Sequence, residues 1–204
     1  MKNLLLKIKL FFILIFVNFQ KKINRSGSKN FQVTALEDGK KYWISRSVAV
    51  DAMIVVYDKK TERHYVLMVK RGKGLISHQD YWCIPCGFMD WDENGIQAVS
   101  RELWEETNLN LLDLLNLSVL NNYTKMPYFV NTEPLKTDNQ NVSLYYGLYL
   151  SVDELPEISN INCEPDEIDE VRWVEIFEEL PTLGKIAFNH KQRIGEFCNM
   201  NSIY

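Results

Sequence analysis

The sequence predicts one layered domain of mixed α and β structure, of the α/β or α+β class, over residues 37–204. A chain of 204 residues is long enough to bury one substantial core, and 46% hydrophobic residues is ordinary for a globular protein. Short apolar segments rich in β-branched residues alternate with two segments of helical periodicity. Strands interleaved with helices bury their apolar faces by packing the helices against a sheet.

The first elements of this domain form a predicted β-hairpin. Residues 47–57 are rich in Val and Ile and predict a strand, the polar residues 58–63 turn the chain, and residues 65–69 predict a second strand. A basic loop with two glycines follows at residues 70–74. Residues 81–84 are a short apolar segment that a proline ends.

Two helices and two more strands are predicted downstream. Residues 95–107 carry an apolar stripe at helical spacing and predict a helix. Residues 142–152 alternate in a way typical of a half-buried strand, and residues 171–176 predict another short strand. Residues 183–198 predict a closing helix.

Residues 1–36 differ in composition from the rest of the chain. They contain seven Lys or Arg and no Asp or Glu, whereas the remainder holds 16 basic and 27 acidic residues. The apolar run at residues 10–17 is shorter than the roughly 20 residues that a spanning helix needs, and no small residues mark a cleavage site after it. We expect residues 1–22 to be an uncleaved membrane-proximal anchor, a poor signal peptide, or an extension outside the working protein.

The overall charge restricts the partners. A net charge of −4 argues against a general nucleic-acid binder, because such proteins present basic surfaces. We expect a cytoplasmic location unless residues 1–22 associate with the membrane or direct export. The sequence leaves the oligomeric state open.

Cys83 and Cys86 form a C-x-x-C pair that fits neither common use of such a pair well. A redox motif opens a helix, whose N-terminus lowers the thiol pKa, whereas residues 87–90 predict a loop. A zinc site needs a second pair of ligands at suitable spacing, and the other cysteines and the three histidines do not supply one. Redox and zinc chemistry stay as alternatives.

The strongest chemical signal is a spaced set of acidic residues. Gly87 is followed after five residues by Glu93, and after seven more by the run R-E-L-W-E-E. At 100° per residue, the carboxylates of Glu102, Glu105 and Glu106 fall within an arc of about 100° on the predicted helix. Like charges at these spacings destabilise a bare helix. Divalent cations reverse that penalty, and Mg²⁺ prefers carboxylates, waters and substrate phosphates, so the helix predicts a metal site for phosphate chemistry.

These residues resemble the signature of the Nudix hydrolase family, G-x5-E-x7-R-E-U-x-E-E-x-G-U, in which U is aliphatic. The match covers residues 87–109, with Asn108 in place of the last Gly. Asn is the next most tolerant residue of left-handed backbone, so the helix should still end there. The resemblance implies a Nudix-like α/β/α sandwich with a mixed β-sheet and a loop-helix-loop motif, over about residues 45–195.

The resemblance also implies Mg²⁺ or Mn²⁺ as cofactor and suggests how the motif holds it. Glu105 and Glu106 should be direct ligands, and Glu102 a ligand or the general base. Arg101 should fix a motif carboxylate through a charge-assisted hydrogen bond. Glu93 should reach the same cluster from the preceding loop.

Residues outside these carboxylates complete the expected site. The family usually has Pro-Gly-Gly where this chain has Pro85-Cys86-Gly87, and the first of those glycines offers a backbone carbonyl to the metal. Any residue has that carbonyl, so Cys86 should supply it. Family members often recruit one more carboxylate from a distant loop, and Glu167 is our candidate. Arg71 and Gly87 are candidates for contact with the substrate.

The resemblance implies a metal-dependent hydrolase that cleaves the diphosphate linkage of a nucleoside diphosphate joined to another moiety X. The partner is thus a small-molecule nucleotide diphosphate, and the sequence does not identify X. The alternative is a catalytically silent binding or regulatory module of the same fold, although the acidic positions of the motif are intact. An isopentenyl diphosphate isomerase would need cysteine signatures that are not found around residues 83–86.

Overall fold

The computed structural model describes residues 31–35, 39–116, 125–133 and 141–204, so the predictions for residues 1–30 lie outside it. The chain divides into two compact units, residues 1–46 and 47–204, a boundary later than the one predicted after residue 36. In the first unit, β1 (Phe31–Thr34) and β2 (Lys41–Ile44) pair in antiparallel orientation. Within the described ranges, no helix is long and apolar enough to cross a membrane.

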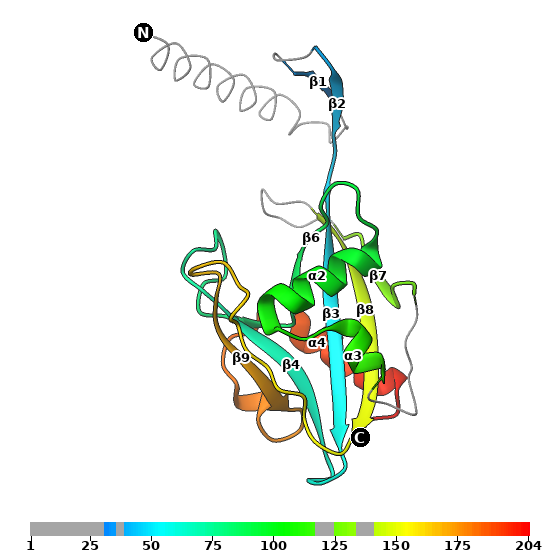
Figure 1. The fold of residues 1–204 in the computed structure, drawn as a ribbon, viewed down its shortest axis with the longest axis vertical. Coiled ribbons are helices and arrows are strands. Elements are labelled where there is room, and N and C mark those ends of the chain that lie inside the picture. The colour runs from blue at the N-terminus through cyan, green and yellow to red at the C-terminus, as the bar shows by residue number, and fades with distance from the viewer. Residues whose placement is uncertain (1–30, 36–38, 117–124, 134–140) are drawn as a thin grey trace. The chain divides into compact units, whose positions relative to one another are not determined.

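A mixed β-sheet forms the centre of the second unit (Figure 1). Its described strands run in the order β5-β4-β3-β8-β7, with β6 also paired to β3 and β9 also paired to β4. The β3–β8 pair is parallel, whereas the hairpin pair β3–β4 and the pair β4–β9 are antiparallel. The predicted hairpin and the predicted mixed sheet are therefore confirmed. The strand bounds are β3 (Ser47–Asp58), β4 (Arg63–Arg71), β5 (Trp82–Cys83), β6 (Cys86–Phe88), β7 (Phe129–Asn131), β8 (Asn141–Val152) and β9 (Ile168–Glu175).

Helices cover both faces of this sheet. Helices α2 (Gly95–Thr107) and α3 (Leu111–Asn116) lie on one face, and α4 (His190–Met200) lies on the other (Figure 1). Alternate residues of β3 enter the two cores: Val50 and Ala52 pack with α2 and α3, while Met53 and Val55 pack with α4. A period of two follows from strand geometry. The predicted α/β/α sandwich is confirmed.

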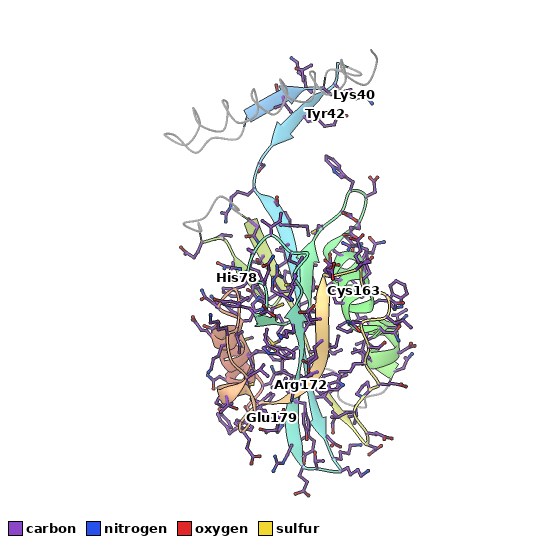
Figure 2. The ribbon with its side chains drawn as sticks, turned by 90° about the vertical axis from the view of Figure 1, so that its left-hand side faces the viewer. Lys40, Tyr42, His78, Cys163, Arg172 and Glu179 are labelled. Atoms are coloured by element: carbon purple, nitrogen blue, oxygen red, sulfur yellow. The ribbon has the colours of Figure 1, made fainter. Side chains whose placement is uncertain are left out.

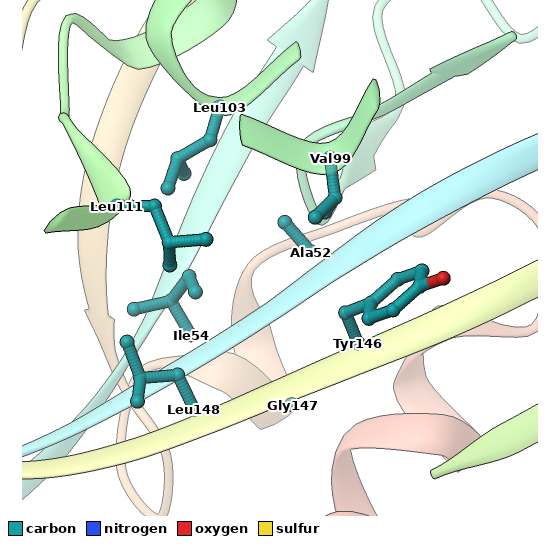
Figure 3. Close-up of a pocket in the computed structure, with 8 residues that line it drawn as sticks. All are labelled: Ala52, Ile54, Val99, Leu103, Leu111, Tyr146, Gly147 and Leu148. Atoms are coloured by element: carbon teal, nitrogen blue, oxygen red, sulfur yellow. The ribbon is translucent and has the colours of Figure 1, made fainter. Parts of the chain in front are cut away.

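A small apolar cavity lies beneath α2 and α3. It measures about 10 Å³ and is lined mainly by aliphatic side chains, together with Tyr146 (Figure 3). A void of this size holds one water at most, so it is a packing gap and not a ligand site. The lining residues are Ala52, Ile54, Val99, Leu103, Leu111, Tyr146, Gly147 and Leu148.

The prediction of a closing helix from residue 183 was wrong in its start. Helix α4 begins at His190, and residues 180–182 form a short 3₁₀ turn. One local and one long-range cause prevent an earlier start. Gly184, Phe188 and Asn189 have φ values of 103°, 55° and 61°, which a right-handed helix excludes. The backbone of Trp82 also bonds to residues 185 and 187, so this segment pairs with β5.

Several short elements were not predicted from the sequence, β6, β7 and α3 among them. Residues 87 and 88, expected to be part of a loop, belong to β6 because residues 86–88 pair with β3 through Ala49, Val50 and Asp51. Strand β7 is a three-residue partner of β8. Helix α3 has a local signal that was overlooked, since the Asn110 side chain accepts a hydrogen bond from the N–H of Leu112.

Candidate active site

Helix α2 carries the acidic motif, and the sequence fixes both of its ends. The Asn94 side chain accepts hydrogen bonds from the N–H groups of Ile96 and Gln97, and the Gln97 side chain bonds back to the N–H of Asn94. This capping box satisfies N–H groups that the first turn leaves unpaired. At the other end, Asn108 adopts the left-handed conformation, with φ 60°, and donates its N–H to the carbonyl of Trp104. The expectation that Asn108 replaces the motif glycine is confirmed.

The Arg101 side chain connects three motif carboxylates. Its Nη1 donates to Glu102 Oε1 at 2.8 Å and to Glu105 Oε2 at 3.0 Å. Its Nη2 donates to Glu93 Oε1 at 2.7 Å and to the carbonyl of Phe88 at 2.9 Å. These bonds lower the pKa of Glu93, which also accepts the N–H of Asp90. The guanidinium therefore joins the loop before α2 to the acidic face of the helix, as predicted for Arg101 and Glu93.

Glu102 lies against the backbone of Gly87. A Cβ atom at residue 87 would lie 2.1 Å from Glu102 Oε1, so the glycine leaves room for this carboxylate. Glu102 is only 8% exposed, and its burial raises the pKa of the carboxyl to about 7 in spite of Arg101. The structure thus brings Gly87 to a motif carboxylate and explains the glycine by close approach.

Glu106 is the most deeply buried of the motif carboxylates. It is 3% exposed, and its Oε2 accepts the backbone N–H of Cys86 at 2.9 Å. Burial raises the pKa of this carboxyl well above its ordinary value, and the negative charges around it, Glu102 and Glu167 among them, raise it further. The structure therefore brings the backbone of Cys86 to the motif without use of its thiol, and the role of the Cys86 carbonyl toward a metal stays a prediction.

Glu167 precedes β9 in a loop that contacts α2. Asn162, in the same loop, donates to the carbonyl of Trp104 and to the side chain of Asn108, and Cys163 lies beside α2 in Figure 2. The Cys163 thiol donates to Glu167 Oε2 at 3.5 Å. The Glu167 charge raises the pKa values of both Glu102 and Glu106. The structure therefore brings Glu167 to the motif, although its role as a metal ligand stays a prediction.

The chemistry of this cluster fits a hard divalent cation. One guanidinium, that of Arg101, pairs with three motif carboxylates, those of Glu93, Glu102 and Glu105. Burial disfavours the negative charge on Glu102 and on Glu106. Oxygen donors with excess negative charge suit Mg²⁺ or Mn²⁺. As the described side chains stand, no three His, Cys, Asp or Glu groups among them converge on one metal position. Since Arg101 occupies an oxygen of both Glu102 and Glu105, these two side chains would have to turn to ligate together.

Arg71 is engaged away from the motif. Its Nε and Nη2 both donate to the carbonyl of Ser77 at 3.2 Å, and its guanidinium lies 4.9 Å from the ring centre of Phe188. It is 9% exposed. Arg71 thus holds the loop after β4 through the carbonyl of Ser77. Its contact with substrate phosphates stays a prediction.

Cys83 and Cys86 are both free thiols, on β5 and β6. A hydrogen bond with the Cys86 thiol lowers the pKa of Cys83. No helix begins at either cysteine, as predicted. Sequence reasoning missed a different pair of residues behind this turn, Asp51 and His190, because they are 139 residues apart in the chain.

The profile of the NUDIX domain matches residues 48–194 of this chain. The chain belongs to the Nudix family. Its Nudix motif is the loop and α2 described above, and the match also covers the sheet and the start of α4. A search of curated proteins finds no relative.

Solved structures share the Nudix fold. The bifunctional NMN adenylyltransferase/ADP ribose pyrophosphatase from Francisella tularensis is 26% identical, with a TM-score of 0.55, over 76% of this chain and 41% of that one. This chain thus spans less than half of that bifunctional protein. The NUDIX domain of Shewanella oneidensis NrtR in complex with ADP ribose is 19% identical (TM-score 0.52; 78% and 90% covered). A C. elegans Ap4A hydrolase is 17% identical (TM-score 0.53; 76% and 99% covered). The last two similarities concern the fold alone.

Proposed function

We propose that this Nudix domain is a metal-dependent pyrophosphohydrolase that cleaves the diphosphate linkage of a nucleoside diphosphate joined to a moiety X. One observation carries the proposal. The motif is assembled and not merely present in the sequence, because Arg101 binds Glu93, Glu102 and Glu105 while Glu106 binds the backbone of Cys86. A silent module of the same fold has no need of this costly concentration of buried carboxylates.

We assign two roles to the residues of the motif, metal binding and the positioning of the metal ligands. Glu102, Glu105, Glu106 and Glu167, with the carbonyl of Cys86, would hold Mg²⁺ or Mn²⁺, and the metal supplies charge neutralisation along the diphosphate and a water of lowered pKa. Arg101 and Glu93 keep the carboxylates in place. Water attacks one phosphorus, the bridging P–O bond breaks, and the products are a nucleoside monophosphate and phosphorylated X. A Francisella tularensis structure of the bifunctional enzyme contains AMP and a Mn ion, which supports the choice of metals.

ADP-ribose is the first substrate that we propose to test. The Francisella protein that is 26% identical is named as an ADP ribose pyrophosphatase, and the Shewanella domain binds ADP ribose. Fold likeness alone does not select a substrate. The panel therefore also contains NADH, nucleotide sugars, dinucleoside polyphosphates and damaged nucleoside triphosphates.

The test is product analysis by chromatography with Mg²⁺, with Mn²⁺ and with EDTA. We expect metal-dependent release of AMP and ribose 5-phosphate from ADP-ribose, or the corresponding products from another member of the panel. Glu105→Gln should remove most of this activity. Glu196→Gln is the matched control, because Glu196 is also a helical carboxylate paired with an arginine, Arg193. Tight nucleotide binding by calorimetry without turnover in either metal would favour the silent module instead.

A further inference from the structure

A buried histidine–aspartate pair lies behind the turn that precedes the Nudix motif. His190, the first residue of α4, is 0% exposed, and Asp51, in the middle of β3, is 4% exposed. His190 Nε2 lies 3.1 Å from Asp51 Oδ1. The other ring nitrogen, Nδ1, lies 3.1 Å from the backbone nitrogen of Ile84.

The backbone fixes the tautomer of His190. The N–H of Ile84 is a donor, so Nδ1 must accept, and the ring proton sits on Nε2 and points at Asp51. Asp51 thus orients the ring, and the ring holds Ile84. The carboxylate thus sets the tautomer of the histidine. In that tautomer the lone pair of Nδ1 points at the backbone N–H of Ile84.

The segment held by His190 is the one that meets the motif. Three successive residues are bonded: Ile84 N–H to His190, the Pro85 carbonyl to the N–H of Ala52 at 2.8 Å, and Cys86 N–H to Glu106 at 2.9 Å. Cys86 also lies opposite Asp51 in the β3–β6 pair. The dyad therefore reaches the motif from the α4 side of the sheet, and Glu106 reaches the same turn from the α2 side.

The dyad is costly to bury. Asp51 Oδ2 has no hydrogen-bond partner among the described residues. Aromatic rings surround the histidine, with Tyr145 at 6.1 Å and Phe188 at 5.4 Å between ring centres. A buried carboxylate oxygen without a hydrogen bond destabilises a fold, because its desolvation is not compensated. A purely apolar contact at this place would be cheaper, but it would leave the N–H of Ile84 without an acceptor.

We propose that Asp51 and His190 are positioning residues of the hydrolytic site, which hold the turn at residues 84–86 where the Cys86 carbonyl can face the divalent cation. The inference rests on the proposed function for its chemical meaning, and on the Asp51–His190–Ile84 bonds for its geometry. Neither side chain touches substrate or metal in this scheme. The two act through the backbone that they fix.

The test compares His190→Leu with His64→Leu. His64 is a matched control, because its Nε2 is also bonded to one side chain, Tyr149 at 3.0 Å, on the same sheet, but it lies in β4 beside the hairpin turn. His190→Asn is the conservative variant, since its side-chain oxygen can replace Nδ1 as acceptor. Asp51→Asn, which is nearly isosteric, serves if His190→Leu does not fold.

Three readouts separate positioning from a merely structural role. In metal-free protein, we expect amide exchange at Ile84, followed by NMR, to be about ten-fold or more faster in His190→Leu, since one lost hydrogen bond is worth about a factor of ten. Mn²⁺ affinity, measured by EPR without substrate, should weaken several-fold. In steady-state kinetics kcat should fall while KM changes little, and His190→Asn should recover part of each effect.

The outcomes are distinct from those of the proposed function. Unchanged Ile84 exchange in folded His190→Leu, or faster exchange with wild-type Mn²⁺ affinity, would overturn the inference. Equal effects in His64→Leu would do the same. If the wild-type protein hydrolyses nothing in the panel, the proposed function fails by itself, and the exchange and Mn²⁺ measurements still decide whether the dyad positions the turn.

Discussion

The backbone N–H of Cys86 donates a hydrogen bond to the carboxylate of Glu106 at 2.9 Å, which joins the turn before the motif to the acidic face of α2. Because the donor is a main-chain group, this bond does not depend on the residue type at position 86. The Cys side chain at a position where Gly is usual is therefore compatible with an intact site. The bond also keeps a carboxylate in place that burial alone would expel.

Glu106→Gln should separate the fold from the chemistry. The amide keeps an acceptor for the Cys86 N–H and removes a buried charge, so the metal-free variant should be as stable as the wild type or more stable. Its activity should fall by about a hundred-fold or more, because one of the proposed metal ligands is lost. Thermal unfolding with and without Mg²⁺ measures the loss of metal binding. Metal at a hundred times its Kd should stabilise the wild type by about 3 kcal/mol and the variant far less.

Glu175→Gln is the matched control for that substitution. Glu175 is also buried and accepts a backbone N–H, from Glu178, but it lies at the end of β9 opposite to Glu167. We expect it to retain both activity and metal stabilisation. A Glu106→Gln protein that hydrolyses at the wild-type rate would remove Glu106 from the catalytic site.

Arg101→Lys tests whether the forked guanidinium is needed or only its charge. Lys presents one ammonium and cannot bridge Glu93, Glu102 and Glu105 together. We expect a loss of about 1 to 3 kcal/mol in the free energy of unfolding, measured in urea, and a fall in kcat of about ten-fold or more. Arg172→Lys is the control, because Arg172 makes two longer ion pairs, with Glu170 at 3.6 Å and Glu179 at 3.8 Å, and its guanidinium lies 5.7 Å from the ring centre of Trp82. An equal loss in both variants would argue against a special role for Arg101.

The parts of the fold that local sequence determines were predicted well. Helix α2 has the bounds expected for residues 95–107, because Asn94 and Asn108 mark its ends by local hydrogen bonding and backbone conformation. Strand β8 was predicted from its alternation, but the expectation of a half-buried strand was wrong, because Tyr145 is buried in the core with α4 and Tyr146 in the core with α2. The acidic residues of the motif share a face because helix geometry places them there.

The remaining features depend on partners that are distant in the sequence. Strand β6 exists because residues 86–88 pair with β3, and α4 starts late because residues 185–187 bond to Trp82. Asp51 and His190 are 139 residues apart, so no window along the chain connects them. A single acidic residue inside the apolar run of β3 was the available signal for Asp51. The bonding of Arg71 to Ser77 likewise depends on how a loop folds back.

Gly87→Ala should damage the site through one methyl group. The added Cβ would lie 2.1 Å from Glu102 Oε1, so the carboxylate must leave its position beside the turn. We expect kcat to fall by about ten-fold or more, since displacement of a catalytic group by about 1 Å can cost a hundred-fold. Steady-state kinetics under saturating Mg²⁺ measure it.

Gly195→Ala provides the opposite expectation in the same protein. Residue 195 lies inside α4, and a Cβ there meets nothing within 4 Å. The substitution should stabilise the fold by about 0.5 to 1 kcal/mol, because Ala is the better helix former. If Gly87→Ala and Gly195→Ala have the same kcat, Gly87 is not required for the close approach of Glu102.

The metal-free protein should lose stability as the pH rises from about 4.5 to about 7. Burial raises the pKa of Glu102 from 4.5 to about 7, so in this window the folded protein keeps a proton that the unfolded chain has released. Stability rises with pH only where the unfolded state binds more protons, and here the folded state binds more. The full effect of this one group is at most about 3 kcal/mol, at about 1.4 kcal/mol per pKa unit. Glu106, whose pKa is also raised, acts in the same direction.

Urea unfolding in EDTA at pH 5 and pH 8 measures this dependence. Glu102→Gln should reduce the pH slope and leave the contribution of Glu106, whereas Glu164→Gln, in an exposed part of the loop before β9, should leave it unchanged. Saturating Mg²⁺ should reverse the slope for the wild type, because metal ligation requires the ionised carboxylates and competes with protons. An identical slope for wild type and Glu102→Gln would mean that the Glu102 carboxylate is already ionised at pH 5 in the folded protein. Glu102 would then carry its negative charge without metal, and a raised pKa of Glu102 could not be the reason that a divalent cation stabilises the cluster.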